Sequence, residues 1–210
     1  MTTKTQLSVE EAMKARHSVR KYQPGVVIPK EELNEILALA ATAPSSWNLQ
    51  HWRYLVITSR EQKERILPIA YGQQQVVDSS ATIVILGDLE ADKSAAPVYQ
   101  QSLDKGLITQ EVYNIMISQI ESAYKGNPEL AHREAILNAS LSAMQLMLAA
   151  KAKGYDTCPM GGFDREALIK ELNIPPRFIP VMMITIGKAA APAHATMRFP
   201  LEELVIEESF

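Results

Sequence analysis

Apolar residues recur along this chain at two different spacings, which predict a mixture of strands and helices. Three short runs dense in apolar and β-branched residues predict buried strands, at residues 52–58, 82–86 and 181–186. Spacings of three and four residues predict helices at residues 9–15, 29–42, 134–153 and 164–172, one after Ser59, and one around Tyr113. Because these elements do not alternate regularly, we expect an α+β fold.

The predicted helix over residues 134–153 has apolar side chains around most of its circumference. They include Ile136, Leu137, Leu141 and Met144. A helix of this kind is buried on more than one side. We therefore expect a central helix or a helix in a subunit interface.

Length and composition fit one globular domain over residues 1–210. The net charge of −3 leaves no basic excess for a nucleic acid. The sequence contains neither a polybasic run nor a stretch of about 20 successive apolar residues, so it does not predict association with a membrane. The N-terminus lacks the apolar core of a signal peptide, so a cytoplasmic location is expected. One cysteine and four scattered histidines exclude a disulfide framework and give no support to a metal site.

Common catalytic and nucleotide-binding motifs are missing from the sequence. The nine glycines form neither of the two frequent nucleotide-binding loops, and G-x-S-x-G is absent. Cys158 lies in an apolar stretch and is interpreted as a packed side chain rather than a nucleophile. No catalytic side chain is therefore assigned.

The segment from Arg16 to Arg20 (Arg-His-Ser-Val-Arg) follows the predicted first helix. If it is extended, the side chains of Arg16, Ser18 and Arg20 point the same way. Two guanidinium forks and a hydroxyl would then form a cradle for a phosphate. The alternative is a solvated basic turn at the end of a helix.

Two further segments combine polar groups with sharp turns. Residues 43–52 include Asn48 and Gln50, whose amides suit the edge of a heterocycle, although a plain polar loop is the alternative. Pro159-Met-Gly-Gly162 can present bare backbone N–H groups to a flat ligand. The alternative for that segment is an ordinary strand-to-helix turn.

In this order and spacing, the segments resemble the FMN-dependent NAD(P)H nitroreductases of bacteria over nearly the whole chain. The resemblance also includes Arg198-Phe-Pro-Leu-Glu-Glu203 near the C-terminus. It implies a nitroreductase-like fold, with a mostly antiparallel mixed sheet flanked by helices in an intertwined homodimer. FMN would lie without covalent attachment at the dimer interface.

The resemblance also implies roles for individual residues. Arg16, Ser18 and Arg198 would contact the FMN phosphate, with His17 alongside and Arg20 near the pyrimidine edge of the flavin. Residues that would reach the flavin from the second subunit are Pro44, Ser45, Ser46, Asn48 and Gln50. Residues that would line the ring near N5 are Pro159, Met160, Gly161 and Gly162. Gln73 would contact the ribityl chain or the phosphate.

Three positions depart from the usual family pattern. His51 stands where proline is usual, Gly161 where some members carry glutamate, and Thr196 where a lysine often helps to bind the phosphate. The phosphate site would therefore depend more on Arg16 and Arg198.

The implied activity is ping-pong hydride transfer from NAD(P)H, through FMN, to an electron-poor acceptor such as a nitroaromatic, a quinone or an activated alkene. Residues 91–128 are expected to form a lid-like helical excursion that sets acceptor preference. Its tyrosines at 99, 113 and 124 are candidates for stacking on the acceptor, although core packing is the expectation for Tyr113. The alternative is an FMN-binding or flavin-fragmenting protein with little reductase activity.

Overall fold

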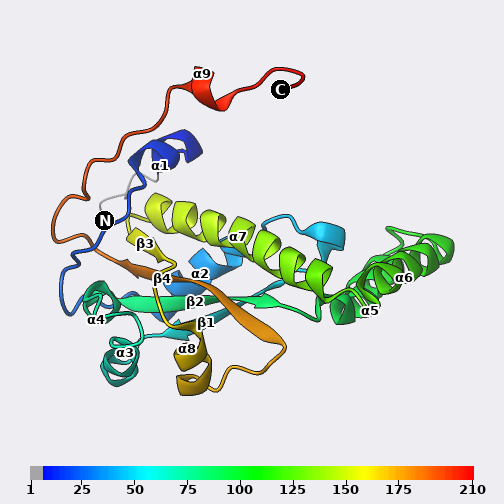
Figure 1. Ribbon diagram of the computed structural model, residues 1–210, viewed down its shortest axis with the longest axis horizontal. Helices are drawn as coiled ribbons and strands as arrows, with labels where there is room; N and C mark the ends of the chain where they lie inside the picture. The colour runs from blue at the N-terminus through cyan, green and yellow to red at the C-terminus, as the bar shows by residue number, and fades with distance from the viewer. Residues whose placement is uncertain (1–6) are drawn as a thin grey trace.

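The computed structural model describes residues 7–210 and contains a four-stranded sheet with helices on both faces (Figure 1). The strands are β1 (Trp52–Ile57), β2 (Ala81–Asp88), β3 (Asp156–Met160) and β4 (Phe178–Gly187). They lie in the order β1-β2-β4-β3, and each neighbouring pair is antiparallel. A parallel bridge between Ser18 and Thr157 extends the β3 edge. The predicted α+β class and mostly antiparallel mixed sheet are confirmed.

Helices cover the sheet in two groups. One face packs against α2 (Lys30–Ala40) and α7 (Pro128–Ala152), and the other packs against α3 (Arg60–Ile66), α4 (Gln75–Asp78) and α8 (Arg165–Glu171). The remaining helical segments are α1 (Val9–Ala15), η1 (Ser46–Asn48), η2 (Ala91–Ser94), α5 (Ala95–Asp104), α6 (Gln110–Tyr124) and α9 (Leu201–Leu204).

The central strand β2 explains why both faces of the sheet are covered. Successive side chains of a strand point to opposite faces, and the apolar run of β2 is continuous. Ile83 and Ile85 join the core beneath α2 and α7, whereas Val84 and Leu86 join the core beneath α3 and α8. Every residue of β2 is buried. A strand buried on both faces needs this uninterrupted apolar sequence.

Helix α7 lies close to the sheet because both surfaces carry small residues at the contact. A Cβ on Gly87 would lie only 2.9 Å from the backbone oxygen of Ala135. The buried face of α7 is rich in alanine, including Ala139 and Ala143. The length and mean hydropathy of α7 are those of a membrane span, but its apolar buried face packs in the main core of the domain.

The opposite face of α7 remains exposed in a single chain. Ile136, Leu137, Leu141 and Met144 are each 39–52% exposed. The prediction of apolar side chains around α7 is therefore correct, but one chain covers only one side of the helix.

Several element boundaries differ from those predicted. Helix α1 has its predicted bounds and its Ser8–Glu11 capping box. Helix α7 begins at Pro128, earlier than predicted, because Asn127 accepts a hydrogen bond from the backbone N–H of Leu130 and caps the helix. Pro29 precedes α2 as its N-cap instead of occupying its first turn. Strand β3 was not predicted, because it is short and contains Pro159.

Beyond β4 the chain forms an extended C-terminal arm, residues 188–210, which ends beyond α1 and away from the sheet (Figure 1). Its apolar side chains are largely uncovered: Met197 is 92% exposed and Phe199 is 70% exposed. An arm of this composition lacks an apolar surface to pack against in its own chain.

Candidate active site

The Arg16–Arg20 segment is held in an extended conformation at the edge of the sheet. Arg16 ends α1 with φ −71° and ψ 120°, which turns the chain out of the helix. The backbone N–H of Val19 then donates to the oxygen of Thr157 in β3 at 3.0 Å. Val19 is buried, while Ser18 is partly exposed and Arg20 is exposed on either side of it. The segment therefore has the extended form on which the phosphate-cradle hypothesis depends.

A small cavity of about 100 Å³ brings this segment together with the C-terminal arm. Among the described residues that line it there are three arginines, two histidines and two hydroxyl residues, but no carboxylate: Arg16, His17, Ser18, Arg20, His194, Thr196 and Arg198. Arg198 donates to the hydroxyl of Thr196 at 3.0 Å. We call this cavity the arginine pocket. Guanidinium groups gathered without a counter-charge favour a phosphate or carboxylate ligand.

The glycine turn, Gly161 and Gly162, follows β3 directly. A Cβ on Gly161 would meet no atom within 4 Å, so open space lies beside its backbone. Gln73 lies next to this turn and donates from its amide to the oxygen of Gly162 at 2.7 Å. The side chain of Met160 is buried in the core, so only its backbone faces the turn. The structure thus brings Gln73 and the glycine turn together.

Cys158 lies in β3 between these two features. Its side chain is buried, and burial raises the pKa of the thiol, although Arg20 and Arg16 oppose the rise. A buried neutral thiol is a weak nucleophile. The interpretation of Cys158 as a packed side chain is consistent with this environment.

The loop that joins α2 to β1, residues 44–51, has a strained backbone. Trp47, Asn48 and Gln50 all have positive φ, at 50°, 55° and 53°. Left-handed residues other than glycine cost about 1–3 kcal/mol each and persist only where their surroundings enforce them. Such strain is typical of binding and catalytic loops.

Two polar residues of α7 enforce this conformation through Ser46. The Ser46 hydroxyl donates to Glu134 Oε2 at 2.6 Å, and the Ser46 backbone N–H donates to Asn138 Oδ1 at 2.8 Å. Burial favours the protonated form of Glu134, but hydrogen bonds from Ser46, Asn138 and Arg133 hold its pKa below the ordinary value. Ser46 is thus an anchor of the loop within its own chain.

These anchors were missed from the sequence. Glu134 and Asn138 lie four residues apart on the buried side of α7, and that spacing was the available signal. Asp88 at the end of β2 was missed as well. It is buried, receives two hydrogen bonds from Arg177 at 2.7 and 2.8 Å, and its backbone N–H donates to the oxygen of His51.

The arginine pocket and the loop lie at opposite ends of α7. The loop is tied to Glu134 and Asn138, whereas Lys151 pairs with Asp156 at the start of β3, beside the Ser18–Thr157 bridge. At 1.5 Å of rise per residue, the stretch from Asn138 to Lys151 spans about 20 Å. Within one chain, the loop residues Pro44, Ser45, Ser46, Asn48 and Gln50 are therefore not brought to the arginine pocket.

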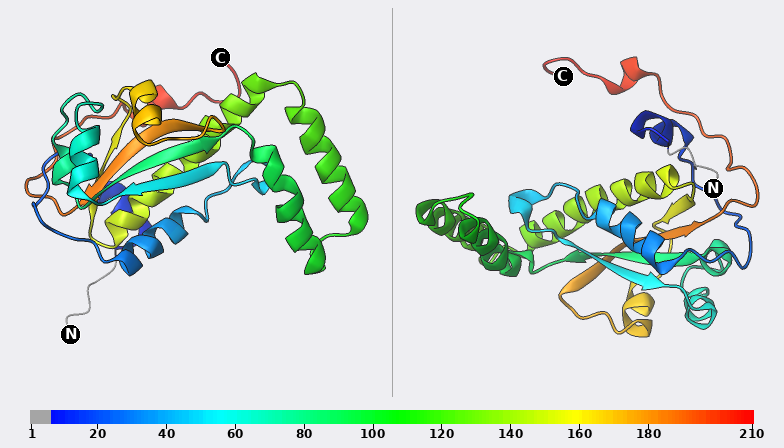
Figure 2. Two further views of the ribbon diagram at one scale, coloured as in Figure 1. Left: turned by 90° about the horizontal axis from the view of Figure 1, so that it is seen from below. Right: turned by 180° about the vertical axis from the view of Figure 1, so that it is seen from behind.

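The predicted lid forms a helical excursion of η2, α5 and α6 that projects beyond the sheet (Figure 2). None of its described residues lines the arginine pocket. Its base packs instead on the loop: the Tyr99 hydroxyl donates to the Trp47 oxygen at 3.2 Å, and Tyr124 is buried. Tyr113 is half-buried on α6. If the excursion acts as a lid, it therefore does so at the end of the molecule that carries the loop, and not over the arginine pocket of the same chain.

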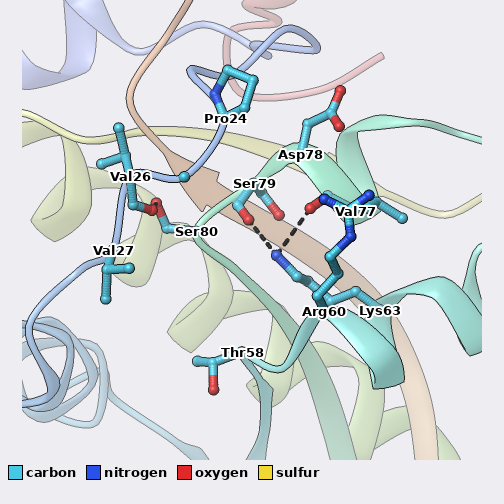
Figure 3. A pocket seen from close by; sticks show the side chains of 11 residues that line it. Pro24, Val26, Val27, Thr58, Arg60, Lys63, Val77, Asp78, Ser79 and Ser80 are labelled. Carbon is cyan, nitrogen blue, oxygen red and sulfur yellow. Dashed lines mark hydrogen bonds between the residues drawn. The ribbon is translucent and has the colours of Figure 1, made fainter.

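A second cavity of about 250 Å³ lies near the start of α3 (Figure 3). Its buried cation, Lys63, donates to the oxygens of Val77 at 2.9 Å and Ser79 at 2.6 Å. These bonds cap the end of α4 and fix the start of β2. Because the Lys63 ammonium group already has these partners, the arginine pocket is the stronger candidate for an anion site.

Replacing Glu134 by glutamine should flatten the acid dependence of stability. The folded-state pKa of Glu134 lies below the ordinary 4.5, so its contribution is present above that pH and is lost as the pH falls through the lower value. Urea unfolding between about pH 3.5 and 7 measures this dependence. Below pH 4.5 the wild type should lose stability more steeply than Glu134→Gln. If the free energy of unfolding depends on pH equally in the two proteins, the ionised Glu134 carboxylate does not anchor the loop.

Comparison with known proteins shows the family to which the chain belongs. Residues 13–188 match the Nitroreductase family. The Bacillus subtilis protein YodC, whose name assigns it to the NAD(P)H nitroreductases, is 50% identical over 92% of this chain and 96% of its own. The CLA biosynthesis enone reductase of Lactiplantibacillus plantarum is 36% identical over 89% of this chain and 88% of its own.

A solved structure adds the three-dimensional likeness. A protein of Exiguobacterium sibiricum, assigned as a nitroreductase and crystallised in complex with FMN, superposes with a TM-score of 0.92. The two sequences are 37% identical, and the match covers 99% of this chain and all of that one. With the family match over most of its length, the chain belongs to the nitroreductase family.

Proposed function

We propose that this protein is an FMN-dependent oxidoreductase that uses NAD(P)H to reduce small electron-poor acceptors. The arginine pocket carries the proposal, because three guanidinium groups without a carboxylate suit a phosphate monoester. The glycine turn beside it leaves room for a flat ring to approach the backbone. The proposed acceptor classes are nitroaromatics, quinones and activated alkenes; the names of relatives include nitroreductases and an enone reductase.

The residues described above fit FMN in order along the ligand. Arg16, Ser18 and Arg198 would hold the phosphate, with His17 beside them. Arg20 would place a cation near the pyrimidine edge, and Gln73 would fix the turn and contact the ribityl chain. The backbones of Pro159, Met160, Gly161 and Gly162 would lie along the ring.

FMN, when bound, accepts a hydride from NAD(P)H and passes two electrons to the acceptor. The chain's own residues orient the ring, supply the edge cation and exclude water from one face. Because one open face beside the glycine turn would serve both ligands, we propose that they bind in turn, in a ping-pong order. The protein side chains described here include none positioned as a nucleophile.

The site requires a second copy of the chain. The strained loop lies about 20 Å along α7 from the arginine pocket, so a second subunit would supply Pro44, Ser45, Ser46, Asn48 and Gln50. The apolar face of α7 and the apolar C-terminal arm are the surfaces available for that association. We therefore propose an intertwined homodimer, located in the cytoplasm, with two composite sites.

The dimer proposal is tested by sedimentation. Exposed side chains on α7 and the arm give an apolar surface of the kind found in obligate dimers, which bury on the order of 2,000 Å² or more. At low micromolar concentration, one species of twice the chain mass is expected. A stable monomer that retains FMN would contradict the proposal.

The reductase proposal is tested by colour. The purified protein should be yellow, NADH or NADPH should bleach it under nitrogen, and adding a quinone should restore the colour. A panel of acceptors with both nucleotides then ranks the substrates. A yellow protein that neither nucleotide bleaches would instead be an FMN-binding or flavin-fragmenting protein.

Arg198→Ala should weaken the binding of FMN much more than that of riboflavin, which lacks the phosphate. A charge-assisted contact is worth about 1.5–3 kcal/mol, or roughly tenfold or more in affinity. Fluorescence titration of the apoprotein with each flavin measures the difference. Arg60→Ala is the control, because Arg60 is exposed, pairs with Glu64 and lines the other cavity. Equal weakening for both flavins would remove Arg198 from the phosphate site.

A further inference from the structure

We propose that His51 and Tyr124 form a positioning pair that couples the helical excursion to the strained loop and thereby sets acceptor selectivity. His51 is the last residue of the loop and is fully buried. Its Nε2 lies 2.8 Å from the hydroxyl of Tyr124, the last residue of α6. The bond thus joins the loop to the base of the excursion, and its effect on selectivity rests on the proposed function.

The pair is the centre of a small contact set between loop and excursion. The Tyr99 hydroxyl donates to the Trp47 oxygen at 3.2 Å, and the rings of Trp47 and Tyr124 meet edge to face at 6.3 Å. Leu49 of the loop packs in one apolar cluster with Ile120 of α6. The loop and the excursion base therefore form a single packed unit.

The outer part of the excursion carries exposed apolar side chains. Leu107 in the turn between the helices is 72% exposed, and Ile115 of α6 is 47% exposed. The two helices project beyond the sheet (Figure 2). Helix α6 extends about 22 Å at 1.5 Å per residue, so a small rotation at its base moves the tip much further. The contacts at the base consequently set where the excursion lies.

The chemistry of the pair suits a permanent link. Burial lowers the pKa of His51, opposed by Glu134 and Asp88, and burial raises the pKa of Tyr124. Both side chains are therefore neutral at neutral pH. The His51 Nδ1 atom is buried without a partner among the described residues, which favours the tautomer that carries its proton on Nε2. His51 then donates to the Tyr124 oxygen.

This arrangement connects two functions of the proposed site. The loop would contact the flavin of the second subunit, while the excursion would border the space for the acceptor. A link between them fixes the opening over the ring without touching FMN. Loosening the link should therefore admit bulky acceptors more readily and leave FMN binding unchanged.

Tyr124→Phe removes only the hydroxyl and tests the link. The ratio of kcat/KM for menadione to that for benzoquinone should rise by roughly threefold, the effect of one neutral hydrogen bond. FMN affinity and the rate of bleaching by NADH should stay as in the wild type. Tyr113→Phe is the matched control, because Tyr113 is a half-buried tyrosine on the same helix. In otherwise wild-type protein, His51→Gln can still donate to the Tyr124 hydroxyl and should keep the wild-type ratio, whereas His51→Leu cannot and should raise the ratio as Tyr124→Phe does.

Hydrogen–deuterium exchange supplies a readout that is independent of activity. In Tyr124→Phe, exchange should increase together over residues 95–124 and 45–50, but not in the sheet. An unchanged acceptor ratio, or equal losses for every acceptor together with weaker FMN binding, would overturn the proposal. If Tyr124→Phe does not fold, Tyr99→Phe tests the neighbouring link with the same readouts. If NAD(P)H fails to reduce the wild-type protein but exchange still increases over both segments in Tyr124→Phe, the reductase proposal is refuted and the coupling of loop and excursion is retained.

Discussion

The close packing of α7 on the sheet is the constraint on which the remaining structure depends. Gly87 and Ala135 allow the helix to lie against β2, so the helix acts as a straight rod of fixed length. One of its ends fixes the strained loop through Glu134 and Asn138, and the other leads into β3 and the arginine pocket. The separation of the loop from the arginine pocket follows from that length, and this separation is the basis for the proposed second subunit.

Contacts from two other parts of the chain stabilise the strained loop. The left-handed conformations of Trp47, Asn48 and Gln50 are unfavourable in isolation. Helix α7 holds the loop through Ser46, and the excursion holds it through His51. Because both supports come from distant parts of the sequence, the loop is pre-organised by the tertiary fold rather than by its own turn residues.

Local signals in the sequence predicted a large part of this architecture. The capping box of Ser8 and Glu11 predicted the bounds of α1, and the apolar run of β2 predicted a strand. The order of the Arg16–Arg20 and Pro159–Gly162 segments indicated two features that the structure places along the same β3 edge.

Long-range contacts account for what the sequence did not predict. Strand β3 forms because β4 offers an edge for pairing, and its proline and short length gave little local signal. Glu134 and Asn138 are two of several polar residues in α7, and only the fold shows that they face the loop. Likewise, the pairing of Asp88 with Arg177 joins residues far apart in the chain.

The burial of Cys158 affects how readily the proposed electrophilic acceptors can modify the protein. Quinones and activated alkenes are electrophiles that alkylate thiolates, and thiolate content controls the rate of that attack. Cys158 is the sole cysteine of the chain and lies beside the proposed flavin site, yet its side chain is buried and its pKa is raised. Burial and a raised pKa both slow alkylation of this thiol by the electrophilic acceptors that the protein is proposed to reduce.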